Sequence, residues 1–319
     1  MRLLVLGGAG YIGSVVAAQL VAAGHEVTVA DDLSKGHPWA VPPGAAFARV
    51  DVLDRPALDP VMAGQDAVLH FAARSLVGES VDDPVGYFRA NVTGSLHVLD
   101  AMRAHGVRRL VFSSTAAVYG DPDEVPIVET APTRPTNPYG ASKLAVDTVI
   151  GFQAAAAGLG AVSLRYFNVA GASGELGEAH HPETHLIPLV LQVAAGLRPK
   201  VQIHGTDYPT PDGTAIRDYI HVEDLARAHL LALDVTTTPG HLVYNLGNGN
   251  GASVREVIEV AREVTGHPIP AEEGPRRPGD PPVLVASSAR IQAELGWQPE
   301  KPGLGEMIAD AWAFLRARA

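Results

Sequence analysis

Apolar residues in the first half of the chain gather into short runs that alternate with longer alanine-rich stretches. Short runs that are apolar on both faces are typical of strands buried in a parallel sheet. The predicted strands cover Leu3–Leu6, Val27–Ala30, Phe47–Val50, Ala67–Phe71, Arg109–Ser113 and Val162–Phe167. The predicted helices cover Ile12–Ala23, Pro56–Met62, Gly94–His105 and Tyr139–Ala157. This alternation predicts an α/β fold with a doubly wound parallel sheet that binds ligands at the carboxyl ends of its strands.

The regular alternation stops after Asn168, which indicates a second domain. Residues 171–184 and 205–215 are rich in Gly, Pro and polar residues. A strand at Leu242–Leu246 is expected to return to the first sheet. We therefore expect a Rossmann domain of residues 1–168 plus about 216–250, and a smaller, discontinuous α/β substrate domain of about 169–215 plus 251–319.

Composition narrows the class of protein and of partner. A chain of 319 residues with 46% hydrophobic content can build a sizeable core. Its net charge of -11, without a Lys/Arg run, argues against nucleic-acid and anionic-membrane partners. The absence of cysteine excludes disulfides and thiolate metal sites and suits a reducing cytoplasm, the expected location. Glycines interrupt the first apolar run after Leu6, so neither a signal peptide nor a membrane span is expected at the N-terminus.

A glycine-rich turn, GGAGYIG, follows the first predicted strand and opens a helix. Gly7, Gly10 and Gly13 suit a tight turn whose backbone approaches a pyrophosphate at the positive helix end. Asp31 ends the second strand, about 20 residues further on, where a carboxylate accepts ribose hydroxyls and repels a 2′-phosphate. These residues predict a dinucleotide site that prefers NAD to NADP. Asp51, just beyond the third strand, either bonds the adenine or serves as a turn residue.

The stretch NPYGASKLAVD carries the candidate chemistry. Asn137 is a good helix cap and Pro138 suits a first turn, so Tyr139 and Lys143 share a helix face. An ammonium beside a phenol favours the phenolate and moves its pKa down from about 10, although such a pair also occurs on ordinary surface helices. Thr115, at the carboxyl end of the fifth strand, adds a hydroxyl at the same edge. Thr115 can then bond a substrate oxygen, Tyr139 can transfer a proton, and Lys143 can bind the nicotinamide ribose.

GGAGYIG, FSST and the Tyr139-x-x-x-Lys143 spacing resemble the extended short-chain dehydrogenase/reductase family. Within it the chain resembles the UDP-glucose 4-epimerases. The matching segments are HFAARSLVGES, NVTGS, LRYFNVAGA, DYPTPDGTAIRDYIHVEDLA, YNLGNG and RRPGD. The resemblance implies a tightly bound NAD and the interconversion of UDP-glucose and UDP-galactose through oxidation at sugar carbon 4. It also implies a homodimer through the helices at residues 94–105 and 139–157.

The expected site residues fall into three groups. Catalysis is assigned to Thr115, Tyr139 and Lys143. The residues expected at the cofactor are Gly7, Gly10, Tyr11, Ile12, Gly13, Asp31, Asp32, Asp51, Val52, Phe71, Ala72, Ala73, Asn91, Ser113, Tyr139, Lys143 and Tyr166. Those expected at the UDP-sugar are Thr115, Tyr139, Asn168, His185, Leu186, Gln202, His204, Arg217, Tyr219, Arg277 and Asp280.

Several features bear on the alternatives. Ala116 and Ala117 replace the acidic pair of related dehydratases, which disfavours elimination, and Ser75 replaces a lysine that some members place near the cofactor. Leu284 is of intermediate size where a small residue admits N-acetylated hexoses, so a 4-epimerase for an N-acetylhexosamine, pentose or uronate stays open. A non-catalytic NAD-binding regulator is a further alternative. HHPETH, with His181 and His185, does not match HExxH, so no metal is expected.

Overall fold

The computed structural model describes residues 1–277 and 280–318. Pro278 and Gly279 of the RRPGD motif lie outside the described residues. The chain folds into two compact units: unit 1 comprises residues 1–120, 133–165 and 226–244, and unit 2 comprises residues 121–132, 166–225 and 245–319. In the described parts of the chain, no helix has the length and apolar character needed to span a membrane.

The first elements in the chain build unit 1. Its strands are β1 (Arg2–Leu6), β2 (Glu26–Asp31), β3 (Ala46–Arg49), β4 (Ala67–His70), β5 (Arg109–Thr115), β6 (Gly160–Tyr166) and β12 (Gly240–Leu246). Its helices are α1 (Tyr11–Ala22), η1 (Pro38–Ala40), α2 (Arg55–Met62), α3 (Val77–Asp82), α4 (Pro84–Phe88), η2 (Arg89–Thr93), α5 (Gly94–Ala104), η3 (Ala116–Val118), α6 (Pro138–Ala157) and most of α8 (Val222–Val235), whose residues 222–225 belong to unit 2.

The remaining elements belong to unit 2. Its strands are β7 (Asn168–Ala170), β8 (Ala172–Ser173), β9 (Leu176–Gly177), β10 (Val201–His204), β11 (Ile216–His221), β13 (Gly251–Ser253), β14 (Ala271–Gly274) and β15 (Val283–Leu284). Its helices are α7 (Leu186–Ala194), α9 (Val254–Thr265), α10 (Ala289–Leu295) and α11 (Leu304–Arg318).

A seven-stranded sheet in the order β12-β6-β5-β4-β1-β2-β3 confirms the predicted α/β doubly wound fold, including the returning strand β12. Leu6 pairs with Ala30 of β2 and with His70 of β4, and both pairings are parallel. His70 in turn pairs with Phe112 of β5. These registers bring the ends of β1, β2, β4 and β5 to one edge of the sheet, where the glycine turn, Asp31 and Thr115 follow.

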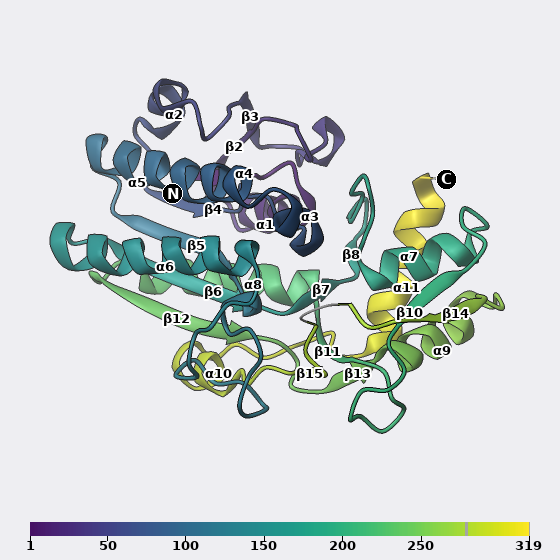
Figure 1. The fold of residues 1–319 in the computed structure, drawn as a ribbon. Helices are drawn as coiled ribbons and strands as arrows, with labels where there is room; N and C mark the ends of the chain where they lie inside the picture. Colours follow the sequence, from purple (N-terminus) through teal and green to yellow (C-terminus); the bar gives the residue numbers. More distant parts are fainter. Residues whose placement is uncertain (278–279, 319) are drawn as a thin grey trace. The chain divides into compact units, whose positions relative to one another are not determined.

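Helices α2, α5 and α6 bury their apolar sides in one core together with residues of the sheet. Leu58, Val98 and Ile150 represent the three helices in this core, and Phe112 and Val68 represent strands β5 and β4. Figure 1 shows α5 and α6 in front of the sheet and α1 behind it. This packing fixes the position of α6, the helix that carries Tyr139 and Lys143.

Unit 2 is built around β11, which pairs with β7, β13 and β15. Its core combines residues of α7, α9 and α11, including Val190, Val257 and Ile308. Because β11 belongs to this second sheet, residues 216–225 lie in unit 2, together with residues 121–132 and 245–250. The division expected from the sequence had assigned those three stretches to the Rossmann domain.

Candidate functional site

The start of α6 brings Tyr139 next to Thr115. Asn137 caps the helix as predicted, since its Oδ1 accepts a hydrogen bond of 2.9 Å from Gly140 N. A Cβ at Gly140 would lie only 2.4 Å from Ala117 O, so glycine allows the helix to approach the end of β5 closely. The Tyr139 hydroxyl is hydrogen-bonded to the Thr115 hydroxyl, which also accepts a bond of 3.1 Å from Ala117 N. A phenol and an alcohol therefore meet at the carboxyl edge of the sheet.

Lys143, one turn further along α6, is buried beneath the end of β5. Its Nζ donates a 2.8 Å hydrogen bond to the carbonyl of Ser113 and lies 4.8 Å from the centre of the Phe112 ring. Burial lowers the pKa of Lys143 to about 8, and the Asp147 carboxylate partly opposes this effect. The ammonium is thus close to the change between its charged and neutral forms at neutral pH.

The expected effect of Lys143 on Tyr139 is wrong in this structure. Burial raises the pKa of Tyr139, and only the hydrogen bond with Thr115 acts in the opposite direction. The physical reason is that the lysine charge is directed at the Ser113 carbonyl, while the phenol loses solvent. The protein alone therefore favours the neutral phenol.

The sequence-based reasoning missed Asp147, although it lies four residues after Lys143 in the same quoted stretch. Its Oδ2 accepts hydrogen bonds from Ser114 Oγ at 3.0 Å and from Arg165 Nη2 at 3.1 Å. Arg165 also donates to the Tyr119 hydroxyl at 3.1 Å. This buried network joins α6 to the ends of β5 and β6. The spacing of Tyr139, Lys143 and Asp147 by four residues was the signal that could have revealed it.

The glycine turn has the geometry of a phosphate cradle. A Cβ at Gly13 would lie 2.3 Å from Gly7 O, so the turn itself requires this glycine. A Cβ at Gly10 would meet only Gly7 O, at 3.4 Å, and Gly10 has no side chain that could accept hydrogen bonds from the first turn of α1. Tyr11 and Ile12 begin that helix. The backbone here is open toward an anionic group at the positive end of α1, as NAD requires.

Asp31 fastens this turn to the second strand. Its Oδ2 accepts from Ala9 N at 3.0 Å and its Oδ1 accepts from Leu33 N at 2.8 Å. Burial raises the pKa of Asp31, and these two backbone bonds oppose it. Each carboxylate oxygen retains a further lone pair, so the side chain can still accept ribose hydroxyls.

Other expected cofactor residues lie at or near the same edge. Asp32 accepts hydrogen bonds from Ser34, and Asp51 accepts one from Leu53 N at 2.9 Å, which is the turn role left open above. Val52 packs against the core of unit 1. The amides of Phe71 and Ala72 donate hydrogen bonds to Leu6 O, and Ala73 follows them in the chain. Ser113 is buried in β5. Tyr166 is buried at the last position of β6, where the chain passes from unit 1 into unit 2.

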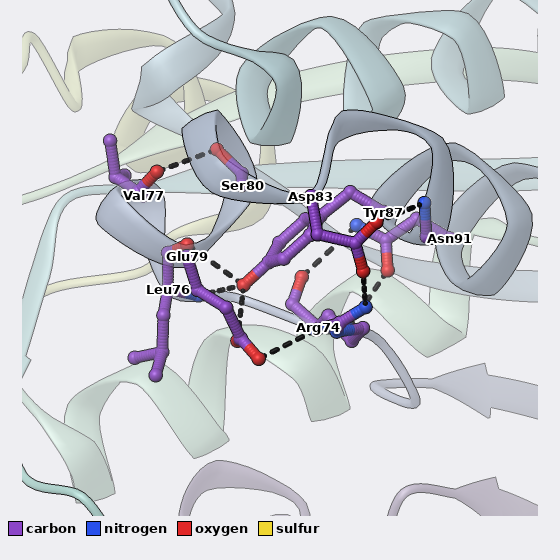
Figure 2. Close-up of polar contacts among 9 residues, drawn as sticks. Arg74, Leu76, Val77, Glu79, Ser80, Asp83, Tyr87 and Asn91 are labelled. Carbon is purple, nitrogen blue, oxygen red and sulfur yellow. Dashed lines mark hydrogen bonds and ion pairs between the residues drawn. The ribbon is translucent and has the colours of Figure 1, made fainter.

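A second cluster that the sequence did not reveal holds the segment after β4. Figure 2 shows the Arg74 guanidinium bonded to Glu79 at 2.6 Å and to Asp83 at 2.8 Å. The fully buried Tyr87 hydroxyl accepts from Leu76 N at 2.9 Å and donates to Leu76 O and Glu79. Asn91, expected at the cofactor, accepts from Arg74 N at 2.8 Å and donates to Arg74 O and Ser142. This cluster fixes the chain that directly follows Phe71, Ala72 and Ala73.

Replacing Tyr87 by phenylalanine is expected to lower the free energy of unfolding by about 1–3 kcal/mol. The hydroxyl accepts the hydrogen bond of Leu76 N, and its loss leaves that amide without this acceptor inside the protein. Urea unfolding followed by circular dichroism measures the change. Val85→Ala is the control, because Val85 lies on the same helix with 68% of its surface exposed and should change stability by less than about 0.5 kcal/mol. Equal stabilities of the two variants would show that the Tyr87 hydroxyl does not hold the segment.

Four of the nine expected UDP-sugar residues of unit 2 lie on β11, on its neighbour β7 or in contact with β11. Arg217 forms an ion pair with Asp280 and also donates to Ile216 O. Leu284 is paired in register with Arg217. Further along β11, Tyr219 is paired with Asn168 of β7. Two expected phosphate and ribose ligands, Arg217 and Asp280, are therefore in direct contact.

The remaining expected residues lie on other elements of unit 2. His185 occupies the N-cap position of α7 without a capping bond from its side chain, and Leu186 packs against the core of the unit. Gln202 and His204 lie on β10, which pairs with β14, and Arg277 is exposed. Burial and the nearby Arg277 lower the pKa of His204. The Asp280 carboxylate acts on the pKa of His204 in the opposite direction, so His204 lies within electrostatic reach of both Arg277 and Asp280.

The chain matches a known protein family and is similar to known proteins over nearly its whole length. Residues 3–247 match the model of the NAD dependent epimerase/dehydratase family. The chain is 58% identical to a UDP-glucose 4-epimerase of Corynebacterium glutamicum over 319 residues, covering 99% of this chain and 96% of that protein.

Two solved structures extend the comparison. The UDP-glucose 4-epimerase from Brucella ovis in complex with NAD superimposes with a TM-score of 0.95 at 45% identity, covering 98% of each chain. The UDP-glucose 4-epimerase from Bifidobacterium longum in complex with NAD+ and UDP superimposes with a TM-score of 0.94 at 38% identity, covering 99% of this chain and 98% of the other. Since the family model spans most of the sequence and these relatives span nearly all of it, the chain belongs to the NAD dependent epimerase/dehydratase family.

Proposed function

We propose that this protein is an NAD-dependent UDP-glucose 4-epimerase that interconverts UDP-glucose and UDP-galactose. The observation that carries the proposal is the contact between the Tyr139 and Thr115 hydroxyls, with Lys143 buried one turn away. A proton-transfer group at the end of β5, beside a glycine turn suited to a dinucleotide, is the arrangement that redox at a single sugar carbon requires. The near full-length similarity to UDP-glucose 4-epimerases supports the same assignment.

In this proposal Tyr139 Oη acts as a phenolate and takes the proton of the sugar 4-hydroxyl, which leaves Tyr139 as the neutral phenol, while Thr115 Oγ1 holds the same oxygen in place. NAD, when bound, would supply a reversible hydride acceptor for carbon 4 and a positive charge near the phenol. Lys143 now donates a hydrogen bond to the Ser113 carbonyl. With NAD bound it would donate to the nicotinamide ribose, either instead of this bond or in addition to it. The 4-keto sugar then rotates and presents its other face. Tyr139 returns the proton to the 4-oxygen, and carbon 4 ends with the opposite configuration.

Such a reaction needs a firm hold on the nucleotide and a loose hold on the hexose. We assign the diphosphate to Arg217 and Arg277, because guanidinium groups match pairs of phosphate oxygens. Asp280 is assigned to the uridine ribose, and its ion pair orients the Arg217 side chain beforehand. Leu284, in register with Arg217, is assigned to the hexose pocket, where its size would limit an N-acetyl group.

The test is a panel of nucleotide sugars with the purified, full-length protein. UDP-galactose should be converted to UDP-glucose, and UDP-N-acetylgalactosamine and UDP-glucuronate should be converted more slowly. If the N-acetylated sugar is the better substrate, the alternative 4-epimerase described above replaces this proposal. If NAD is bound and none of the sugars turns over, the protein is a non-catalytic NAD-binding regulator instead.

We also propose that two copies associate through α5 and α6, as the family resemblance implies, and that the enzyme works in the cytoplasm. The side chains of Phe152 on α6 and Leu96 on α5 expose 73% and 43% of their surface. Large exposed apolar side chains on neighbouring helices suit burial against a second copy.

Phe152→Glu is therefore expected to shift the protein from twice the mass of one chain to a single chain. A charge at the centre of an apolar contact costs several kcal/mol when it has no partner. Light scattering coupled to size exclusion measures the mass. Leu197→Glu, a change at an apolar residue of unit 2 that is 63% exposed, is the control and should leave a dimer intact. A wild-type protein that is already a single chain at micromolar concentration would rule out the dimer.

A further inference from the structure

Four metal-ligating side chains converge in the segment before α7. They form two Glu-x-His units, Glu178 with His180 and Glu183 with His185. The Nδ1 atom of His185 lies 2.7 Å from Glu178 Oε1 and 2.8 Å from Glu183 Oε1, and His180 Nδ1 lies 3.0 Å from Glu178 Oε1. The sequence-based expectation of no metal had considered His181 with His185. The structure instead brings His180 and His185 together, with ring centres 5.4 Å apart.

The cluster is sheltered and faces a cavity. The side chains of Glu178 and Glu183 expose only 9% and 5% of their surface. Both carboxylates and His180 line a cavity of about 310 Å³ within unit 2. Two buried carboxylates this close together need positive charge nearby, which either a protonated His185 ring or a bound cation supplies at this position.

We propose that Glu178, His180, Glu183 and His185 bind one divalent transition-metal ion, with zinc as the expected metal. One ligand atom from each residue lies within 4.8 Å of the others. Ligands at about 2.0–2.1 Å in a tetrahedron are about 3.3 Å apart, so small side-chain movements suffice. Two imidazoles with two carboxylates suit zinc better than magnesium or calcium, and two negative carboxylates balance a charge of +2.

The proposed role of the ion is to hold residues 178–185 against the start of α7. Four protein ligands complete a tetrahedral site and leave no open position, as in structural zinc sites. His185 presents Nδ1 to both carboxylates, so Nδ1 is the ring nitrogen placed to bind the ion. The proposal goes beyond the epimerase function and does not depend on it, because metal binding is measured without turnover.

The experiment compares tag-free full-length protein with His180→Ala and with His181→Ala as the matched control. Each is treated with a chelator, dialysed and titrated with zinc by calorimetry, and its metal content is then measured by mass spectrometry. Wild type and His181→Ala should bind one zinc per chain, and His180→Ala should bind it at least about tenfold more weakly. Zinc should also raise the melting temperature of the first two proteins and not that of His180→Ala.

A second variant keeps the result clear if His180→Ala folds poorly. Glu178→Gln preserves the shape of the side chain but removes a charged ligand, and it should weaken zinc binding in the same way. The proposal fails if the wild type binds less than one zinc per chain under these conditions. It also fails if well-folded His180→Ala and Glu178→Gln proteins bind zinc as tightly as the wild type.

Discussion

Tyr139→Phe is expected to lower the turnover of UDP-galactose by about 10²–10⁴-fold while NAD binding is retained. The substitution removes only the oxygen that exchanges a proton with the sugar. The ring stays on α6, whose start is fixed by Asn137 and by the close approach at Gly140. Initial rates with UDP-galactose and the NAD content of the purified variant measure the two effects separately.

Two controls separate chemistry from structure. Thr115→Ser keeps a hydroxyl beside Tyr139 and should keep most of the activity. Tyr208→Phe removes a buried phenol oxygen that has no hydrogen-bond partner among the described residues, so it should be nearly neutral. If Tyr139→Phe retained more than a tenth of wild-type activity, another group would have to be the base.

Gly10→Ala is expected to lose NAD affinity alone, whereas Gly13→Ala is expected to lose stability as well. Gly10 has φ -85 and ψ 176, a conformation open to alanine, and a Cβ there meets only Gly7 O at 3.4 Å. Gly10→Ala should therefore fold normally and lose at least about tenfold in NAD affinity, because its methyl group stands where the pyrophosphate approaches. At Gly13 a Cβ would lie 2.3 Å from Gly7 O, so Gly13→Ala should lower stability by about 1–3 kcal/mol as well.

Thermal unfolding and NAD titration of both proteins, side by side, measure this difference. Normal NAD affinity in Gly10→Ala would mean that the phosphates do not pass over Gly10. A Gly13→Ala protein as stable as the wild type would mean that the turn can relax, and that the close approach to Gly7 O does not require glycine.

The parts of the fold that local chemistry dictates were predictable. The apolar runs gave the strands of the main sheet, and Asn137 followed by Pro138 gave the start of α6. The placement of Thr115 near Tyr139 followed from the rule that parallel strands end at one edge. These features depend on neighbouring residues or on general topology, so a single sequence contains them.

The direction of the Tyr139 pKa was not predictable, because it depends on burial. Spacing alone placed an ammonium near the phenol, but in the structure Lys143 bonds Ser113 O and the phenol is desolvated. The pairing of His180 with His185 was missed for a similar reason. The HExxH comparison considered only His181 with His185, whereas the fold of a non-helical segment decides that His180 lies beside His185.

The Arg74 cluster depends on contacts between α3, α4 and the loop after β4, which no local pattern reveals. The extent of unit 2 is another example, since the membership of β11 follows from its pairing with β7, β13 and β15. Both features arise from tertiary packing.

In the proposed reaction, carbon 4 of the sugar gives up a hydride and receives the same hydride back. The most direct measurement uses UDP-galactose with deuterium at carbon 4, incubated with the purified protein in ordinary water. The expected product is UDP-glucose that keeps the deuterium at carbon 4. Product in which solvent hydrogen has replaced that deuterium would contradict it.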